Sequence, residues 1–312
     1  MKTRVLCVAL CALTVFLMMG SVCSMYHAMT PHGQNNISTV LRLASYAADN
    51  HPSTMAAQYF AAMVNQQTHG RIRIQVISDG ELGEEEAAME QLCFGGIAFA
   101  IVNCLSMSDD MIAAGGDGTL IPDRGTLNMQ RLDMLCTFEP DYRCIANSGA
   151  LLSSDGQCAG VRVGAHTSAV LAERLERLGM DVVPYTGGDL VSSVYYGYID
   201  GLELPLMVYA TEEYAKTLPY LSLYNGPAST DVLLSSQVSM GSLSAEDQRI
   251  IRACAAEAAQ YQRQIIGRRQ DEAVAALKGK GVKFYPPETA NVPSSDWPLF
   301  RSRFIGGGNT DE

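Results

Sequence analysis

Apolar and polar positions in the first third of the chain predict alternating strands and helices. Residues 40–46 and 97–102 are apolar and rich in strand-forming side chains, and residues 71–77 alternate polar and apolar, as in a strand with one buried face. Residues 52–67 and 84–94 carry apolar side chains at helical spacing. The order strand, helix, strand, helix, strand predicts a mainly parallel sheet flanked by helices.

The same alternation returns in the second half of the chain. Residues 161–163 and 181–184 predict strands, and residues 169–178 and 190–196 predict helices. The intervening residues 105–158 are rich in Gly, Asp and Ser and give no clear pattern. We therefore expect a second α/β lobe that begins near residue 160.

A long helix is predicted near the end of the chain. Ser244 is a good N-cap, and Asp247 stands three residues later, as in a capping box. Helical pattern continues past Gly267 to Lys278. A helix of that length in an α/β protein is expected to brace both lobes.

Composition narrows the class of protein. The 312 residues are 47% hydrophobic and 18% charged, which suffices for a large core and argues against disorder. The formal net charge is −11, and no cluster of Lys and Arg is present. Nucleic acid is therefore an unfavourable partner, whereas a small anion needs only one or two local cations.

The N-terminus carries an export signal. Lys2 and Arg4 precede an apolar run over residues 5–19, which is shorter than the roughly 20 residues a bilayer core needs. Val22 and Ser24 are small residues at −3 and −1 of a cut before Met25. We predict a signal peptide over residues 1–24, with lipidation of Cys23 as an alternative.

Six cysteines remain after removal of the signal. Export permits disulfides, but the spacing includes no CxxC pair and no zinc pattern. Buried free thiols are the favoured interpretation, and the sequence does not choose among the possible pairings. The six are Cys93, Cys104, Cys136, Cys144, Cys158 and Cys254.

Five short segments resemble the periplasmic solute-binding subunit of TRAP transporters, the DctP-type family. These segments are DNHP at 49–52, THGR at 68–71 with GELG at 80–83, EQL at 90–92 with Gly95, GYIDGLELP at 197–205, and LSAEDQ at 243–248. Their order after a signal peptide strengthens a resemblance that each motif alone would carry weakly. It covers about residues 40–102 and 158–287, while residues 105–158 depart from the family pattern.

The resemblance implies a two-lobe α/β periplasmic binding protein, each lobe a mostly parallel sheet, with a long C-terminal bracing helix. Such a protein would close on a small organic ligand and deliver it to TRAP membrane permease subunits. In some relatives a periplasmic tetratricopeptide-repeat protein is a further partner. The resemblance implies no enzyme activity, no cofactor and no metal.

The family's ligand-binding positions are altered in this chain. Its carboxylate-binding arginine falls on Gly164, its cleft aromatic on Gly187 and its ligand-contacting asparagine on Leu204. These changes favour a relatively apolar ligand, since a lost charge-assisted bond weakens carboxylate binding by about 1.5–3 kcal/mol. The alternative is a carboxylate ligand held by Arg143 and Arg162.

Further candidate ligand contacts lie at strand ends and among aromatic residues. Tyr46 and Asn103 end the first and third predicted strands, where ligands bind in open α/β sheets. Tyr185 and Tyr195 could form amphipathic walls, and ordinary packing is the alternative for both. His166 is a weaker candidate contact near the same cleft.

Two other classes of function stay open. GGDGTL at 115–120 resembles the phosphate loop of NAD and lipid kinases, but no other segment supports a nucleotide-binding enzyme. Loss of the arginine also permits an interaction module without a ligand.

The predicted division of the chain follows from these interpretations. Lobe I comprises residues 39–157 with part of 232–265, and lobe II comprises residues 158–231 with part of 266–305. Residues 306–312 are predicted to form a disordered tail.

Overall fold

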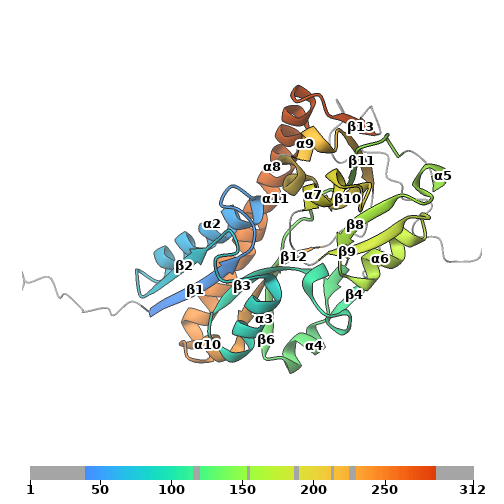
Figure 1. Cartoon of the computed structure of the whole chain (residues 1–312). Helices are drawn as coiled ribbons and strands as arrows, with labels where there is room; N and C mark the ends of the chain where they lie inside the picture. The colour runs from blue at the N-terminus through green and yellow to red at the C-terminus, as the bar shows by residue number, and fades with distance from the viewer. Residues whose placement is uncertain are drawn as a thin grey trace, which may run out of the picture. The chain divides into compact units, whose positions relative to one another are not determined.

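Two sheets with helices packed against them form the framework of the protein (Figure 1). The structure, a computed structural model, describes residues 39–114, 120–152, 155–185, 190–211, 214–224 and 230–285. The predicted signal peptide, the GGDGT motif and the predicted tail lie outside these ranges.

The first sheet contains the predicted strand–helix alternation. Its strand order is β2-β1-β3-β12-β6, in which β1 runs parallel to β3 while β12 runs antiparallel to both β3 and β6. Its strands are β1 (Thr39–Ser45), β2 (Ile72–Ile77), β3 (Phe99–Asn103), β6 (Leu132–Thr137) and β12 (Asp231–Ser236). Its helices are α2 (Pro52–Gln67), α3 (Glu85–Phe94), α4 (Arg124–Met129) and α10 (Gln237–Gly241).

The second sheet has the order β13-β11-β7-β10-β8-β9. Among its described strands, β7 runs antiparallel to its two neighbours, whereas β8, β9 and β10 are parallel to one another. Its strands are β7 (Arg143–Asn147), β8 (Arg162–His166), β9 (Asp181–Tyr185), β10 (Gly201–Pro205), β11 (Tyr220–Tyr224) and β13 (Lys283–Tyr285). The helices around it are α5 (Asp155–Cys158), α6 (Ala169–Glu176), α7 (Leu190–Tyr195), α8 (Leu206–Thr211) and α9 (Tyr214–Thr217).

Two short 3₁₀ turns and a two-stranded sheet follow β3. Cys104–Ser106 and Asp109–Met111 are short 3₁₀ turns, and β4 (Ile112–Ala114) pairs antiparallel with β5 (Leu120–Pro122). Asn103 caps the first of these turns, since its side-chain oxygen accepts a hydrogen bond from Leu105 N–H.

The long helix α11 (Ala245–Gly279) is continuous through Gly267, as the pattern predicted. The hydroxyl of Ser244 accepts a hydrogen bond from Asp247 N–H and so caps the first turn. The helix packs against α2 beside the first sheet and against α8 beside the second. The predicted bracing of both lobes is therefore confirmed.

The chain passes between the sheets earlier than predicted. β6 and β7 both form within the unreadable stretch 105–158, and β7 already belongs to the second sheet. The change of sheet therefore falls between Thr137 and Arg143, so a boundary after residue 157 is too late. β7 escaped prediction because it is short and opens with a buried arginine.

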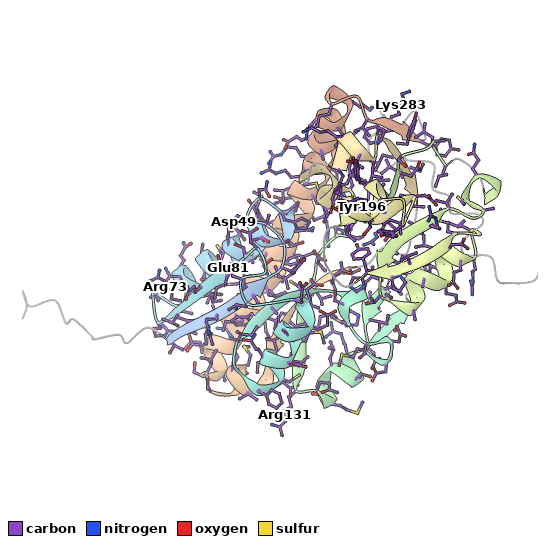
Figure 2. The ribbon with its side chains drawn as sticks, in the orientation of Figure 1. Asp49, Arg73, Glu81, Arg131, Tyr196 and Lys283 are labelled. Atoms are coloured by element: carbon purple, nitrogen blue, oxygen red, sulfur yellow. The ribbon has the colours of Figure 1, made fainter. Side chains whose placement is uncertain are left out.

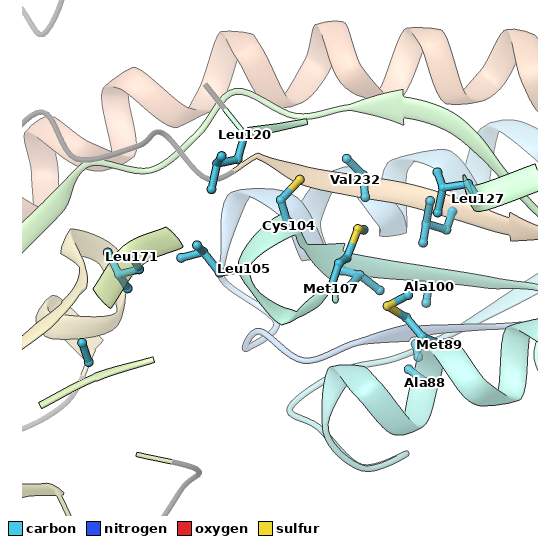
Figure 3. Packing of buried hydrophobic residues seen from close by; sticks show 14 of the residues in the cluster. Ala88, Met89, Ala100, Cys104, Leu105, Met107, Leu120, Leu127, Leu171 and Val232 are labelled. Atoms are coloured by element: carbon cyan, nitrogen blue, oxygen red, sulfur yellow. The ribbon is translucent and has the colours of Figure 1, made fainter. Parts of the chain in front are cut away.

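The buried apolar side chains form three clusters. One lies between the first sheet, α2 and α11, and another lies between the second sheet and α8. The third joins residues from both sheets, because it includes Leu105 after β3 and Leu171 in α6 (Figure 3). Both sheets accordingly belong to one compact unit.

Cys93, Cys104, Cys136, Cys144 and Cys254 are free thiols, as the favoured interpretation expected. Cys104, Cys144 and Cys254 are buried, and burial raises the pKa of Cys104 and of Cys136 to about 12. Within the described ranges, no helix combines the length and apolar character that a bilayer crossing requires.

Candidate functional site

The first half of the candidate site lies at the carboxyl ends of β1 and β3. Tyr46 follows β1, and Asn103 ends β3. Asp231 is at the same edge, because it begins the antiparallel strand β12 and pairs with Asn103. Asn103 Nδ2 donates a hydrogen bond to Asp231 Oδ1 at 2.7 Å. The predicted anchor Asn103 is thus at the expected edge, but its amide group is occupied by structural bonds.

Glu85 at the start of α3 is bonded to the same edge. Its carboxylate accepts hydrogen bonds from Asn103 N–H at 3.0 Å and from the Ser106 hydroxyl. Burial raises the pKa of this carboxyl to about 8, and the negative charge of Asp231 adds to the increase. This burial of Glu85 was not predicted, since the residue stands in a run of three glutamates that indicates only an acidic helix start.

Tyr46 lies beside these glutamates. Its side chain is 52% exposed, and its ring would contact a Cβ at Gly80 at 3.2 Å. Burial first, and then the charges of Glu84 and Glu85, raise the pKa of its hydroxyl. Asp49 and Glu81 lie on the loops after β1 and β2 in the same part of the chain (Figure 2). This edge of the first sheet is therefore strongly acidic.

The second half of the candidate site lies at the carboxyl ends of β8 and β9. His166 ends β8 and pairs with Tyr185, which ends β9. Arg143 is at the same edge, because it begins the antiparallel strand β7 and pairs with Pro205 at the end of β10. The topology therefore gathers Arg143, His166 and Tyr185 on one edge.

Arg143 forms a buried ion pair with Glu203. The Arg143 side chain is 6% exposed and that of Glu203 is fully buried. Arg143 Nε donates to Glu203 Oε1 at 2.7 Å, and a second guanidinium nitrogen donates to Oε2. This two-pronged geometry satisfies both charges inside the protein. Arg143 therefore contributes a positive charge that Glu203 largely neutralises.

Two buried polar atoms lie beyond this ion pair with no hydrogen-bond partner in the described part of the chain. They are Nδ1 of His166 and the hydroxyl oxygen of Ser168. Burial lowers the pKa of His166, while the charges of Glu86 and Arg143 act on it in opposite directions. Ser168 carried no signal in the sequence beyond its place ahead of a predicted helix.

Electrostatic interactions link the two edges. The negative charges of Glu84 and Glu86 at the start of α3 raise the pKa of His166 in the second sheet, against the larger effect of burial. Burial raises the pKa of Tyr185 to about 12, with Glu203 and, more weakly, Tyr46 adding to the increase. The carboxyl edges of the two sheets therefore face the same region of the molecule.

Arg162 is at the wrong edge for the predicted role. It begins β8 and pairs with Asp181, so it lies at the opposite end of the strand from His166. Its guanidinium donates to both carboxylate oxygens of Asp200, at 2.6 and 3.0 Å, and to the carbonyl oxygen of Gly197. The prediction of Arg162 as a ligand anchor is wrong, because this side chain fixes the turn before β10.

Gly164 and Leu204 face apolar interior instead of a ligand. A Cβ at Gly164 would lie 2.9 Å from Ile199 Cδ1 and 3.0 Å from Leu202 Cδ2. Leu204 is 3% exposed within the same cluster. Both positions were predicted as parts of an altered pocket, and the structure corrects this. Gly187 lies outside the described residues.

Tyr195, predicted as a wall of the candidate site, lies away from it. Its side chain is 78% exposed, and its ring contacts that of Tyr196 edge-on. It ends α7, just before the turn whose Gly197 carbonyl is bound by Arg162 at the opposite edge. Tyr195 is therefore not a wall of the candidate site, whereas Tyr185 lies at the expected edge.

The described residues offer no ready metal centre. Nowhere in them do three or more His, Cys, Asp or Glu side chains gather as metal ligands would. Glu85 and Asp231 approach one another, but Ser, Asn and backbone groups occupy their oxygens.

Two α/β sheets whose carboxyl edges face one region, braced by a long helix, define a two-lobe solute-binding protein. The sequence model of the bacterial extracellular solute-binding protein family 7, DctP, matches residues 43–110 and 125–301. The chain belongs to this family, which consists of TRAP-type periplasmic solute-binding proteins and not of enzymes.

Individual relatives agree with this assignment. A solute-binding protein of Chromohalobacter salexigens is 26% identical over 270 residues, covering 78% of this chain and 79% of the relative. The 2,3-diketo-L-gulonate-binding periplasmic protein YiaO of Escherichia coli is 22% identical, covering 78% of this chain and 80% of the relative. A solved TRAP periplasmic solute-binding protein of C. salexigens with bound D-glucuronate superposes with a TM-score of 0.70 at 22% identity, covering 78% and 87% of the two chains.

Proposed function

We propose that this protein captures a small organic acid at the facing carboxyl edges of its two sheets and delivers it to the membrane subunits of a TRAP transporter. The observation that carries the proposal is the gathering of Arg143, His166 and Tyr185 on one sheet edge, opposite Tyr46 on the other. These groups provide positive charge, hydrogen-bond donors and aromatic surface for a polar ligand.

The relatives support an acidic ligand. Those with a named or bound ligand include a protein named for 2,3-diketo-L-gulonate and solved structures that hold D-glucuronate or galactonate. The hypothesis of a relatively apolar ligand loses its basis, because Gly164 and Leu204 do not face the candidate site. The alternative of a carboxylate ligand retains Arg143 but not Arg162.

Export and delivery belong to the same proposal. A signal peptide over residues 1–24, cleaved before Met25, would place the protein in the periplasm with its relatives. The permease subunits would recognise the closed, ligand-bound form. A tetratricopeptide-repeat partner stays a prediction from the resemblance.

A thermal-shift panel tests the ligand class. We expect one of D-glucuronate, D-galacturonate, D-galactonate or 2,3-diketo-L-gulonate to raise the Tm by about 5 °C when present at a hundredfold excess over its Kd. D-glucuronamide, which has the same shape without the charge, is the matched control. The proposal is overturned if no acid shifts the Tm and native mass spectrometry of gently purified protein finds only a neutral ligand or none.

A further inference from the structure

The turn between β8 and α6 leaves an unusual set of hydrogen-bonding groups without partners. Ser168 is the N-cap residue of α6, where a serine hydroxyl ordinarily accepts a hydrogen bond from an amide of the first turn. The N-cap serines of α10 and α11 do this. The hydroxyl of Ser168 makes no capping bond, although the residue is only 7% exposed.

The amides of α6 add donors at the same place. The first amides of any helix point along its axis without intrahelical partners, and together they carry a partial positive charge. Helices α3 and α11 begin with acidic side chains that offset this charge, whereas the first turn of α6 contains none. A buried hydroxyl and the free amides of a helix N-terminus are costly unless a hydrogen-bond acceptor arrives, and the helix dipole favours an acceptor with negative charge.

His166 completes the set from the end of β8. Its Nδ1 is buried and unpartnered within the described residues, two positions before Ser168. Glu84 and Glu86 of the first sheet act on its imidazole, as do Arg143 and Glu203 of the second. Leu171, in the first turn of α6, shares an apolar cluster with Leu105 after β3, which brings the turn to the junction of the two sheets (Figure 3).

We propose that the β8–α6 turn binds the acid group of the ligand, in place of the arginine that relatives would carry at position 164. The ligand carboxylate accepts hydrogen bonds from the Ser168 hydroxyl, from first-turn amides of α6 and from the His166 imidazole. This inference rests on the proposed function and names where its acid group is held. A Cβ at Gly164 would press on the side-chain ends of Ile199 and Leu202, so a larger residue there needs those two side chains to shift.

The same geometry selects a ligand with one acid group. The negative charges of Glu84 and Glu86 act on the His166 imidazole, so we expect them to repel a second carboxylate bound beside it. A sugar monoacid meets these glutamates with hydroxyl donors. We therefore expect D-galacturonate to bind more tightly than the diacid galactarate, which differs from it in the oxidation of the second chain end.

Protonation of His166 couples to binding. Its pKa is low in the free protein, and a bound carboxylate favours the charged imidazole, so affinity rises as the pH falls from 8 to 6. The charges of Glu84, Glu86, Arg143 and Glu203 act on the ring and modify its response. Glu85, whose pKa of about 8 lies at the upper end of this pH range, also becomes protonated as the pH falls. Its contribution to the pH dependence of affinity remains in His166→Gln.

Titration calorimetry with D-glucuronate, D-galacturonate and galactarate tests the proposal. We expect Ser168→Ala and His166→Gln each to weaken binding of the preferred monoacid at least tenfold, and His166→Gln to reduce the pH dependence. Ser168→Ala should not lower the Tm, since no capping bond is lost. The control Ser244→Ala removes a real cap, so it should lower the Tm and leave affinity unchanged.

The outcomes separate the two proposals. If the parent binds a monoacid but Ser168→Ala and His166→Gln bind it equally well, the acid group lies elsewhere and only this inference fails. If no sugar acid binds, acetate is titrated while the imidazole resonances of His166 are followed. A saturable shift that Ser168→Ala abolishes supports the acid site although the proposed sugar-acid class fails, and no shift overturns both.

Discussion

Arg143 and Glu203 show how a charged residue can mark a site without being free to serve it. Both side chains are almost fully enclosed, and two hydrogen bonds join them. Burying two charges is costly, and the attraction between them offsets that cost only while both are present. The pair therefore fixes β7 against β10. The candidate site receives only a weak positive charge from Arg143, because Glu203 largely neutralises it.

Glu203→Gln should lower the free energy of unfolding by about 3–5 kcal/mol, because it leaves the Arg143 guanidinium buried without its counter-charge. Urea denaturation measures the change. Glu173→Gln is the matched control, since it breaks an exposed pair with Arg177 that contributes at most about 0.5 kcal/mol. Equal effects of the two variants would contradict the buried pairing.

Glu85 predicts an unusual dependence of stability on pH. Its folded pKa of about 8 lies above the ordinary value of 4.5, so the folded state holds a proton that the unfolded state has released. This contribution to stability is complete below pH 4.5 and is lost as the pH rises through 8. Urea denaturation between pH 5 and 8 should show that the free energy of unfolding falls as the pH rises. The same measurement on Glu85→Gln gives the contribution of all other titratable groups, and the difference between the two profiles belongs to Glu85.

Glu85→Gln should flatten that fall, because a glutamine resembles the protonated carboxyl and keeps the acceptor for Asn103 N–H. The variant should gain stability relative to the parent at pH 8 and little at pH 5. A parent and variant with parallel pH profiles would show that Glu85 titrates normally.

At the scale of elements, periodic patterns predicted well where helices and strands are long. The helix at 52–67 was predicted with both ends correct, and α11 followed from its cap and its unbroken pattern. β6 and β7 escaped, because neither short strand alternates in burial: β7 is buried throughout, and β6 is half-buried after its first residue. The reversed strands β7 and β12 escaped as well, since strand direction depends on contacts between distant segments.

The close approach of β10 to β7 can be tested at Gly201. A Cβ there would lie 2.4 Å from the carbonyl oxygen of Ala146, which the backbone can relieve only by separating the strands. Gly201→Ala should therefore lower the free energy of unfolding by about 1–3 kcal/mol or more.

Gly279→Ala is the control for that substitution. Nothing lies within 4 Å of a Cβ at this position near the end of α11. The control should stabilise the protein by about 0.4–1 kcal/mol, because alanine lowers the conformational entropy of the unfolded chain. Thermal or urea unfolding measures both changes. A lower stability of Gly201→Ala together with a higher stability of Gly279→Ala supports the strand register, and an unchanged stability of Gly201→Ala contradicts it.

Candidate residues predicted less well than elements. Tyr46, Asn103, Arg143 and Tyr185 lie at the facing edges. The strand ends at Tyr46 and Asn103 are visible in the sequence, whereas Arg143 begins a strand that was not predicted. Arg162 and Gly164 were misjudged: alternation along a strand shows which residues share a face, but not which edge of the sheet is nearer the ligand or what packs above a glycine. Ser168 emerges only from the hydrogen bond that its hydroxyl lacks, and the unpartnered Nδ1 of His166 strengthens a candidate that the sequence ranked as weak.

At the scale of the whole molecule, two sheets contribute unequal charge to one site. The first sheet presents Tyr46 with a rim of glutamates, and the second presents Arg143, His166 and the start of α6. An acid group is therefore stabilised on the second sheet and repelled from the first. A ligand with an acid at one end and hydroxyl groups at the other matches both edges.

Mapping amide chemical shifts during titration with the tightest-binding sugar acid tests the location of this site most directly. We predict the largest changes at the residues that end β1, β3, β8 and β9 and at the first amides of α6, with little change at Arg162 and Gly197. Changes concentrated around Arg162, Tyr195 and Gly197 would place the ligand at the opposite edge of the second sheet and contradict the account.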